Sequence, residues 1–354
     1  MQIQEKIKQL FEKLDNKEQR MVLRTLENKN QSTHSKTKQH PVKSCPYCQS
    51  IDYSKHGKRD SIQRYICKDC KKVFSGKTGT IVHGIKSHKK FEQYFKLMFE
   101  QYLSLSDISK KVGISYQTAF DWRHKILSAI KITTDEFNGI TEIDDIWFLY
   151  SQKGRKGLKY SRIRGGSSRQ GDNNYQVKLL ITADRQQNRD MSVLKIGRIS
   201  KSDIQRKIGD KFNDSCTLVS DKHRSISAFA KSEGIRHKSF KSKDHSATKE
   251  YHVQNVNNMA MRLKNVVDHQ LRGVSTKYLQ NYSNWFGQVE KIKKQPDGIK
   301  KIRATLMKNK EAWDAFTHSE KNYKSFIKKH SERTYRCPTK RSWGTNISNP
   351  TGSK

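Results

Sequence analysis

Acidic side chains stand at the ends of apolar runs, where they could hold metal ions. Asp144 and Asp145 lie in the apolar run 140–150, and Asp221 follows the run 216–220. A buried carboxylate is costly unless it is paired or binds a metal, and strand ends in an α/β sheet commonly carry the chemistry. Two carboxylates at neighbouring strand ends can bind hard divalent cations through oxygen. The alternative is a turn acid or a strand-edge acid, and strand alternation does not decide between Asp144 and Asp145.

An amide and a lysine share one face of a predicted helix. The segment 252–270 has an apolar stripe at helical spacing, flanked by Asn257 and Lys264. The two positions are seven residues apart, which corresponds to about 10 Å along one face of the helix. An amide oxygen can complete a metal shell, and a lysine can hold a phosphate. The alternative for Asn257 is a solvated or capping residue.

Four of the six cysteines form two Cys-x-x-Cys pairs with 18 residues between the pairs. These cysteines are Cys45, Cys48, Cys67 and Cys70. The spacing predicts a closed, tetrahedral, structural Zn²⁺ site. A domain of about 40 residues has too little core to fold unaided, so folding should be coupled to metal binding. The alternative is a redox pair or chance cysteines, whereas Cys216 lies in an apolar run and is expected in the core.

Residues 103–129 have the pattern of a helix-turn-helix. Ile108 and Val112 would face inward on a first helix, Gly113 supplies a turn, and Ser115 could cap a second helix. The alternative is any pair of packed helices. The residues expected near a DNA groove are Tyr116, Gln117, Thr118, Asp121 and Arg123.

These groups require several structural elements to position them. Strands are expected at 140–150, 175–183, 191–196 and 216–220, with helices at 201–209 and 226–233. We predict an N-terminal helix and linker (1–41), a zinc ribbon (42–80), a helix-turn-helix region (88–132), an α/β mixed-sheet domain (138–290) and a basic C-terminal tail (291–354). A helix over 3–27 would either mediate docking or dimerisation, or pack locally.

The charge of the chain indicates a polyanionic partner. Its 354 residues contain 72 Lys and Arg against 34 Asp and Glu, which gives a formal net charge of +38. That value excludes an ordinary neutral enzyme surface and favours a nucleic acid partner. A structural RNA-binding protein or a membrane-surface protein would show the same charge. No apolar run approaches the ~20 residues of a membrane span, and no secretory signal is visible, so we expect a cytoplasmic protein.

The order of these motifs resembles that of a known family. The sequence reads CPYC, CKDC, the helix-turn-helix pattern, EIDD, LVSDKH, HVQNVNNMAMRLK and LRGVSTKYLQNYSNWF. Over roughly residues 42–290 it is similar to bacterial transposases of the insertion sequence 1595 family. The resemblance implies an N-terminal zinc ribbon and a catalytic domain with the ribonuclease-H-like fold. It also implies an enzyme that cuts and rejoins DNA at the ends of its element with two divalent metal ions.

The resemblance also assigns roles to residues of this chain. It implies that Asp144, Asp221 and Asn257 bind Mg²⁺ or Mn²⁺, and that Lys264 completes the catalytic set. The amide of Asn257 departs from a three-carboxylate plan and should weaken the second metal site. The implied partners are double-stranded DNA, as terminal inverted repeats and target, and a second copy of the chain in a homodimer or larger assembly. The alternative is a non-catalytic zinc-ribbon and helix-turn-helix DNA-binding protein, or a decayed transposase.

Overall fold

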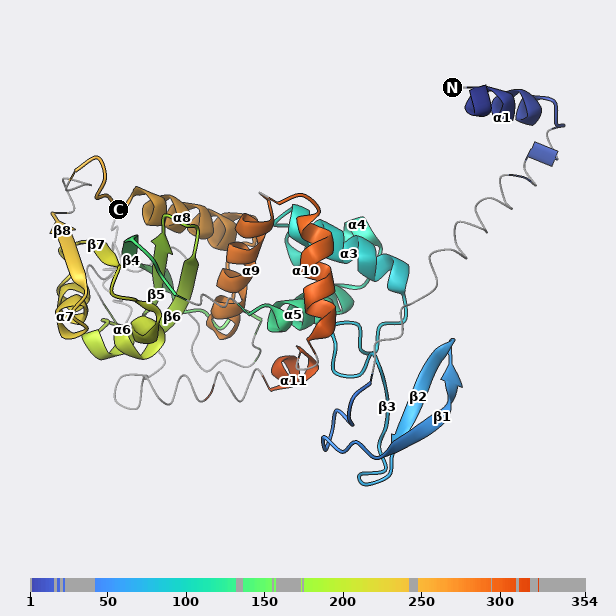
Figure 1. Ribbon diagram of the computed structural model, residues 1–354, viewed down its shortest axis with the longest axis horizontal. Helices are drawn as coiled ribbons and strands as arrows, with labels where there is room; N and C mark the ends of the chain where they lie inside the picture. The colour runs from blue at the N-terminus through green and yellow to red at the C-terminus, as the bar shows by residue number, and fades with distance from the viewer. Residues whose placement is uncertain are drawn as a thin grey trace, which may run out of the picture. The chain divides into compact units, whose positions relative to one another are not determined.

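The computed structural model describes residues 2–15, 18–19, 22, 42–131, 136–154, 156, 173, 175–241, 248–293, 295–309, 312–318 and 324. The chain divides into two compact units between Thr78 and Gly79, and Figure 1 shows the elements of both. Residues 28–41, the linker part of the predicted N-terminal region 1–41, lie outside the described residues, as does the sixth cysteine, Cys337.

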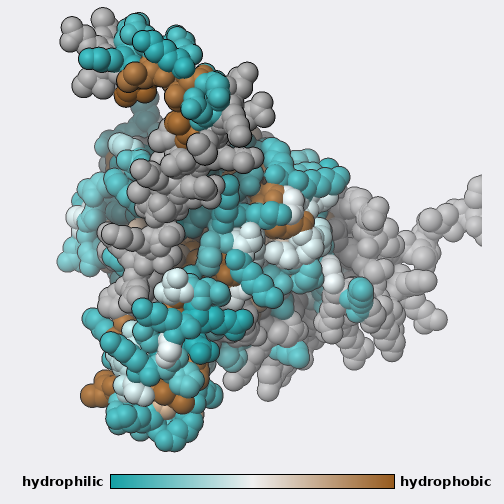
Figure 2. Space-filling model, turned by 90° about the vertical axis from the view of Figure 1, so that its right-hand side faces the viewer, coloured by the Kyte–Doolittle hydropathy of each residue, from teal (hydrophilic) through white to brown (hydrophobic). Residues whose placement is uncertain are grey.

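The first unit begins with a short helix, α1, which spans Gln2–Glu12. Its Ile7 and Leu10 side chains are each 61% exposed. Figure 2 shows apolar surface next to hydrophilic surface on this helix, at the top of the view. Among the described residues, these two side chains therefore belong to no core. The helix expected over 3–27 is confirmed in its first part.

The rest of the first unit is a three-stranded antiparallel sheet in the order β1-β2-β3. The strands are β1 (Tyr53–Arg59), β2 (Ile62–Cys67) and β3 (Val73–Ser75). Its small core contains Cys45, Cys67 and Phe74, against which Tyr53 and Tyr65 pack. The ring centroid of Tyr53 lies 5.3 Å from that of Tyr65 and 5.6 Å from that of Phe74. So few apolar groups cannot hold a fold of this size without a further crosslink.

The second unit begins with three helices. They are α3 (His88–Glu100), α4 (Leu105–Val112) and α5 (Tyr116–Ala129). The Ser104 side chain caps α4 by accepting from the Asp107 amide at 3.2 Å. Gly113 ends α4 with φ 67°, a left-handed conformation that glycine adopts without steric cost. The Ser115 hydroxyl then caps α5 by accepting from the Thr118 amide at 3.1 Å. The two predicted helices and their turn are thus present as secondary structure.

A five-stranded mixed sheet follows, in the order β6-β5-β4-β7-β8. The strands are β4 (Ile140–Leu149), β5 (Gln176–Asp184), β6 (Arg189–Ile196), β7 (Thr217–Asp221) and β8 (Arg236–Phe240). β5 pairs antiparallel with β4 and β6, whereas β7 pairs parallel with β4 and β8. The expected mixed-sheet α/β domain is therefore confirmed, with β8 as a strand that the sequence did not predict.

Helices cover both faces of this sheet (Figure 1). The helices around it are α6 (Lys201–Ile208), the 3₁₀ turn η1 (Gly209–Lys211), α7 (Arg224–Ser232), α8 (Gln254–Lys264) and its π-helical continuation η2 (Asn265–Gln270). Alternation along β4 separates two cores. Ile143 packs with Phe229 of α7 and Ile204 of α6, and Ile146 belongs to the core that contains Val256 of α8.

The core on the α8 side extends into the helical segment that precedes the sheet. The remaining helices are η3 (Thr276–Tyr278), α9 (Leu279–Ile292), α10 (Gly298–Lys308) and α11 (Ala312–Thr317). Trp122 of α5 and Trp285 of α9 belong to this one cluster, as does Leu306 of α10. Region 88–132 and part of the predicted basic tail therefore pack with the sheet. No helix in the described part of the chain is long and apolar enough to cross a membrane.

Candidate active site

Two carboxylates meet where β4 and β7 stop pairing. Glu142 is in register with Val219, and Asp144 and Asp221 each follow two residues later. Because side chains two residues apart share a face of a strand, both aspartates lie on the face covered by α8. The two predicted metal ligands from the strands are thus neighbours on one side of the sheet.

The surroundings of Asp144 disfavour its negative charge. Burial and the nearby negative charges of Asp221 and Asp145 raise the pKa of Asp144 to about 7. The Asp145 amide donates to Oδ1 of Asp144 at 2.8 Å and opposes the rise only in part. Carboxylates that repel each other in this way suit a divalent cation, which would neutralise the charge that they share. The carboxylate donors therefore fit Mg²⁺ or Mn²⁺.

Asp145 lies on the opposite face of the sheet. Its Oδ2 is 2.9 Å from Nζ of Lys178, and both side chains are less than 10% exposed. Its Oδ1 is 3.6 Å from Nε2 of His223. Asp145 is thus held in a buried ion pair with Lys178. Of the two adjacent aspartates, Asp144 is the one that shares a face with Asp221.

The orientation of α8 sets where its polar residues lie. Arg262 forms an ion pair with Glu290 of α9, and α9 packs against the outer strand β6. Asn257 and Lys264 lie on the opposite flank of α8 by helical periodicity, which is the flank toward β7. Nζ of Lys264 is 5.1 Å from the ring centre of Trp147 on β4. The exposed Asn257 side chain is therefore on the same side of the helix as Asp221.

Sequence reasoning missed a pocket beside Lys264. The pocket has a volume of about 280 Å³, and its lining includes Trp147, Lys264, Asp268 and Thr276. Trp147 is 39% exposed although it lies in a strand three residues after Asp144. An exposed aromatic ring next to an ammonium group can stack a base and hold a phosphate.

A second missed feature is an ion pair between a buried carboxylate and an exposed arginine at the N-terminus of α8. Glu142 Oε1 lies 2.7 Å from NH1 of Arg185, which directly follows β5. The available signal was an acid inside an apolar strand, which must find a partner. The sequence alone did not show which residue that partner would be.

Three of the residues predicted near a DNA groove lie in the first turn of α5. Tyr116 is 57% exposed. Gln117 donates through Nε2 to Oδ1 of Asp121 at 2.8 Å, and the hydroxyl groups of Thr118 and Ser115 are 2.8 Å apart. The end of α5 thus presents an aromatic ring, an amide and hydroxyls at the surface of the second unit.

Arg123 corrects the prediction made for it. Its side chain is 1% exposed, with Nε donating to the Tyr94 hydroxyl at 3.2 Å and NH2 donating to the Leu103 carbonyl at 2.9 Å. The guanidinium carbon lies 5.2 Å from the ring centre of Trp285. Arg123 is therefore a core residue that joins α3, α5 and α9, and it cannot reach a DNA groove from this position.

The four predicted zinc ligands converge in the first unit. The Sγ atoms of the four cysteines all lie within 4.8 Å of one another, with 3.6 Å between Cys45 and Cys70 and 3.5 Å between Cys48 and Cys67. A tetrahedral site with Zn–S distances of ~2.3 Å requires S···S separations of about 3.8 Å, whereas a disulfide requires ~2.05 Å. The backbone amide of Cys70 helps to lower the pKa of the Cys67 thiol to about 7. The cluster therefore fits one Zn²⁺.

Cys216 has a different role from these four. Its side chain is buried, and its Sγ lies 3.0 Å from the Thr141 hydroxyl. It belongs to the interior between β4 and β7, as the sequence predicted.

Comparisons with known proteins identify the sheet domain. Residues 136–287 match the family described as "ISXO2-like transposase domain". A curated relative from Halobacterium salinarum, "Uncharacterized protein in transposable element ISH50", is 27% identical over 184 residues, which cover 51% of this chain and 62% of the relative. The chain thus matches less than two thirds of that protein's length. The resemblance to insertion sequence 1595 transposases is confirmed over this segment.

Solved structures give a weaker likeness. A pre-cleavage Mos1 transpososome is 11% identical, covers 66% of this chain and 80% of that chain, and has a TM-score of 0.23. A Mos1 transposase paired-end complex with the left transposon end is 12% identical, covers 63% and 81%, and has a TM-score of 0.19. These scores are too low to support an inference about fold or activity.

Proposed function

We propose that this protein, whose sheet domain belongs to the ISXO2-like transposase family, is a metal-dependent DNA transposase that cuts and joins the ends of an insertion sequence. One observation carries the proposal. Asp144 and Asp221 lie on one face at the ends of adjacent strands, and burial together with the negative charges of Asp221 and Asp145 raises the pKa of Asp144 to about 7. A carboxylate pair of this kind is costly to maintain unless it serves to bind a cation.

The proposed reaction is phosphoryl transfer in two steps. Water first attacks a phosphate at the element's end, which forms a P–O bond and releases a DNA 3′-hydroxyl. That hydroxyl then attacks a phosphate of the target strand, which displaces another 3′-oxygen and joins the two DNAs. Divalent ions, when bound, supply charge stabilisation at the scissile phosphate. No covalent protein intermediate is required.

The residues of this chain have separate tasks in these steps. Asp144 and Asp221 hold the cations through carboxylate oxygens, and Asn257 completes the shell with its amide oxygen. Lys264 holds a phosphate of the bound strand from its position over Trp147. Support for including Asn257 comes from its position on the flank of α8 that faces β7.

End recognition is assigned to the parts of the chain before the sheet. The zinc ribbon and the α4–α5 pair, as a helix-turn-helix, bind the terminal repeats, with Tyr116, Gln117 and Thr118 near the groove. The formal net charge of +38 favours binding to phosphates. Two element ends must be joined to one target, so we propose a homodimer or larger assembly that acts on DNA in the cytoplasm, at the nucleoid.

The amide of Asn257, in place of a third carboxylate, favours a second function. Asn257 brings no negative charge, so a chain with a weakened metal site would bind the ends without cutting them. The test is a strand-cleavage and strand-transfer assay on DNA that carries the element's own flanks, with and without Mg²⁺. Mg²⁺-dependent nicked and joined products support the transposase, whereas tight binding without any product supports the DNA-binding protein.

A further inference from the structure

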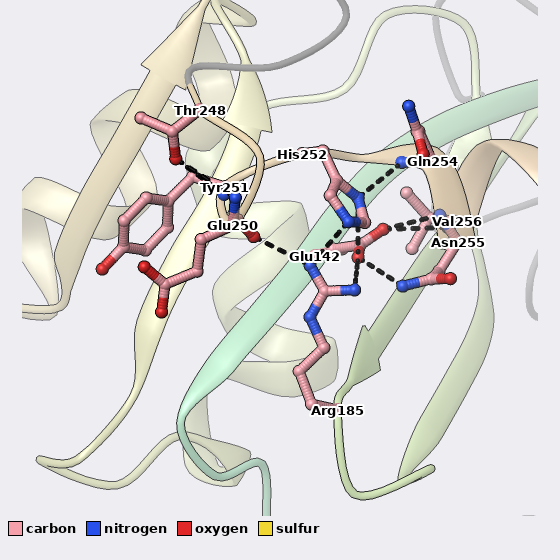
Figure 3. Close-up of polar contacts among 9 residues, drawn as sticks. All are labelled: Glu142, Arg185, Thr248, Glu250, Tyr251, His252, Gln254, Asn255 and Val256. Carbon is pink, nitrogen blue, oxygen red and sulfur yellow. Dashed lines mark hydrogen bonds and ion pairs between the residues drawn. The ribbon is translucent and has the colours of Figure 1, made fainter.

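A buried carboxylate from β4 holds the first turn of α8. Glu142 is 1% exposed, and its Oε2 accepts from the backbone amides of Asn255 at 2.9 Å and Val256 at 3.2 Å. Its Oε1 accepts from the side-chain amide of Asn255 at 2.6 Å (Figure 3). The first amides of a helix have no partner within the helix, and a negative charge at this end is favourable. Glu142 therefore caps α8 from another element of the fold.

Arg185 ties the same carboxylate to the chain that leads into α8. Its NH1 lies 2.7 Å from Oε1 of Glu142. Its NH2 donates to the Glu250 carbonyl at 3.1 Å and lies 3.2 Å from Nε2 of His252. His252 in turn places Nδ1 3.4 Å from Oε1 of Glu142 (Figure 3). The approach to α8 is thus joined to β4 and to the end of β5.

The position of this junction relates it directly to the proposed metal site. Glu142 lies two residues before Asp144 on the same face of β4, and Asn255 lies two residues before Asn257 on α8. We infer that Glu142 is a positioning residue, which sets the placement of Asn257 relative to the two aspartates and so the affinity for the divalent cation. This inference rests on the proposed function.

Asp203 offers a matched control for a purely structural role. It is also a buried acid at a helix N-terminus, and its Oδ2 accepts from the Ser200 amide at 3.0 Å. It is paired with Lys195 at 2.9 Å and with Arg206 at 3.1 Å. It caps α6, which packs on the face of the sheet opposite to α8. Loss of Asp203 should lower stability without moving α8.

The experiment measures Mn²⁺ binding to the full-length, zinc-loaded protein by electron paramagnetic resonance, together with hydrogen exchange in the first turn of α8. Glu142→Ala should weaken Mn²⁺ binding by about tenfold or more, the effect typical of groups that orient metal ligands. It should also accelerate exchange at Asn255 and Val256. Glu142→Gln retains an oxygen acceptor for these amides, so its Mn²⁺ affinity should fall less, by about threefold. Asp203→Asn should bind Mn²⁺ within about twofold of wild type.

The outcomes distinguish failure of the positioning role of Glu142 from failure of the proposed function. Unchanged Mn²⁺ affinity in a folded Glu142→Ala protein overturns the positioning role alone, as does an equal loss in Asp203→Asn. If Glu142→Ala fails to fold, Glu142→Gln decides, and an affinity equal to wild type overturns the inference. Absence of Mn²⁺ binding by wild-type protein overturns the proposed function and the inference together.

Discussion

Replacing Asp144 with asparagine should stabilise the metal-free protein at alkaline pH. The folded protein resists ionisation of Asp144, because burial and the charges of Asp221 and Asp145 raise its pKa to about 7. Asparagine has nearly the same shape and carries no charge. Its side-chain oxygen can also keep the hydrogen bond that Asp144 accepts from the Asp145 amide.

The magnitude and sign follow from linkage. The ordinary pKa is 3.8, so the unfolded state loses its proton near pH 4 and the folded state near pH 7. Stability therefore falls as pH rises through this window, and the full penalty is present above about pH 7. One pKa unit corresponds to about 1.36 kcal/mol, which sets an upper limit of about 4 kcal/mol. Relaxation and water penetration reduce this value, so we expect Asp144→Asn to gain about 1–3 kcal/mol at pH 8.

Urea unfolding followed by tryptophan fluorescence measures this effect. All five tryptophans follow position 79 in the sequence, so the signal reports on the second unit. The buffer must lack Mg²⁺ but also lack chelator, so that zinc stays in the first unit. Added Mg²⁺ should stabilise wild type at pH 8 and Asp144→Asn much less, because only a binding-competent folded state gains from ligand.

The neighbouring acid provides a control with the opposite sign. Asp145→Asn leaves the buried ammonium of Lys178 without its 2.9 Å partner and should cost about 3–5 kcal/mol. The reasoning is refuted if Asp144→Asn destabilises the protein at pH 8, or if its advantage does not shrink between pH 8 and pH 5. Stabilisation by Asp145→Asn would contradict the assignment of the two faces.

Three further predictions concern the other parts of the chain. Cys67→Ser should abolish zinc binding, measured by elemental analysis, and should unfold the sheet of the first unit. Tryptophan fluorescence of the second unit should stay native. Zinc retained by the variant would contradict the four-cysteine site. Arg123→Met should lower the free energy of unfolding by about 2–4 kcal/mol, because buried hydrogen-bonded groups lose their partner. Gln117→Ala should weaken DNA binding with little effect on the free energy of unfolding. The reverse pattern would place Arg123 at the DNA interface. Affinity for DNA should fall steeply with salt because lysines and arginines release counterions from phosphates, and a flat dependence would indicate a mainly apolar partner.

The strands that the sequence predicted are those with continuous apolar runs. β4, β5, β6 and β7 contain runs that are buried on both faces, so their strands and approximate ends were visible. β8 was not predicted, because its sequence Arg-His-Lys-Ser-Phe is polar and it lies at the edge of the sheet. α10 was assigned to a basic tail, because only a few apolar residues such as Ile302 and Leu306 separate its lysines, yet both are buried.

The candidate site also contains residues that the sequence could predict and residues that it could not. A local signal, an acid in or after an apolar run, predicts Asp221 and either Asp144 or Asp145, and it is the family resemblance that selects Asp144. Arg123 was misassigned because its partners, Tyr94 and the carbonyl of Leu103, lie 29 and 20 residues away. Glu142 meets Asn255 across 113 residues, and no local pattern indicates that contact.

The most direct test of the account separates cutting from binding in one variant. Asp221→Ala removes one carboxylate of the proposed pair, whereas end recognition is assigned to residues before the sheet. The measurement compares wild type and Asp221→Ala for binding and for Mg²⁺-dependent cleavage of DNA that carries the element's ends. The account predicts that wild type cleaves, and that the variant binds the ends as tightly as wild type, or slightly tighter, and leaves them intact. Cleavage by Asp221→Ala at the wild-type rate would contradict it.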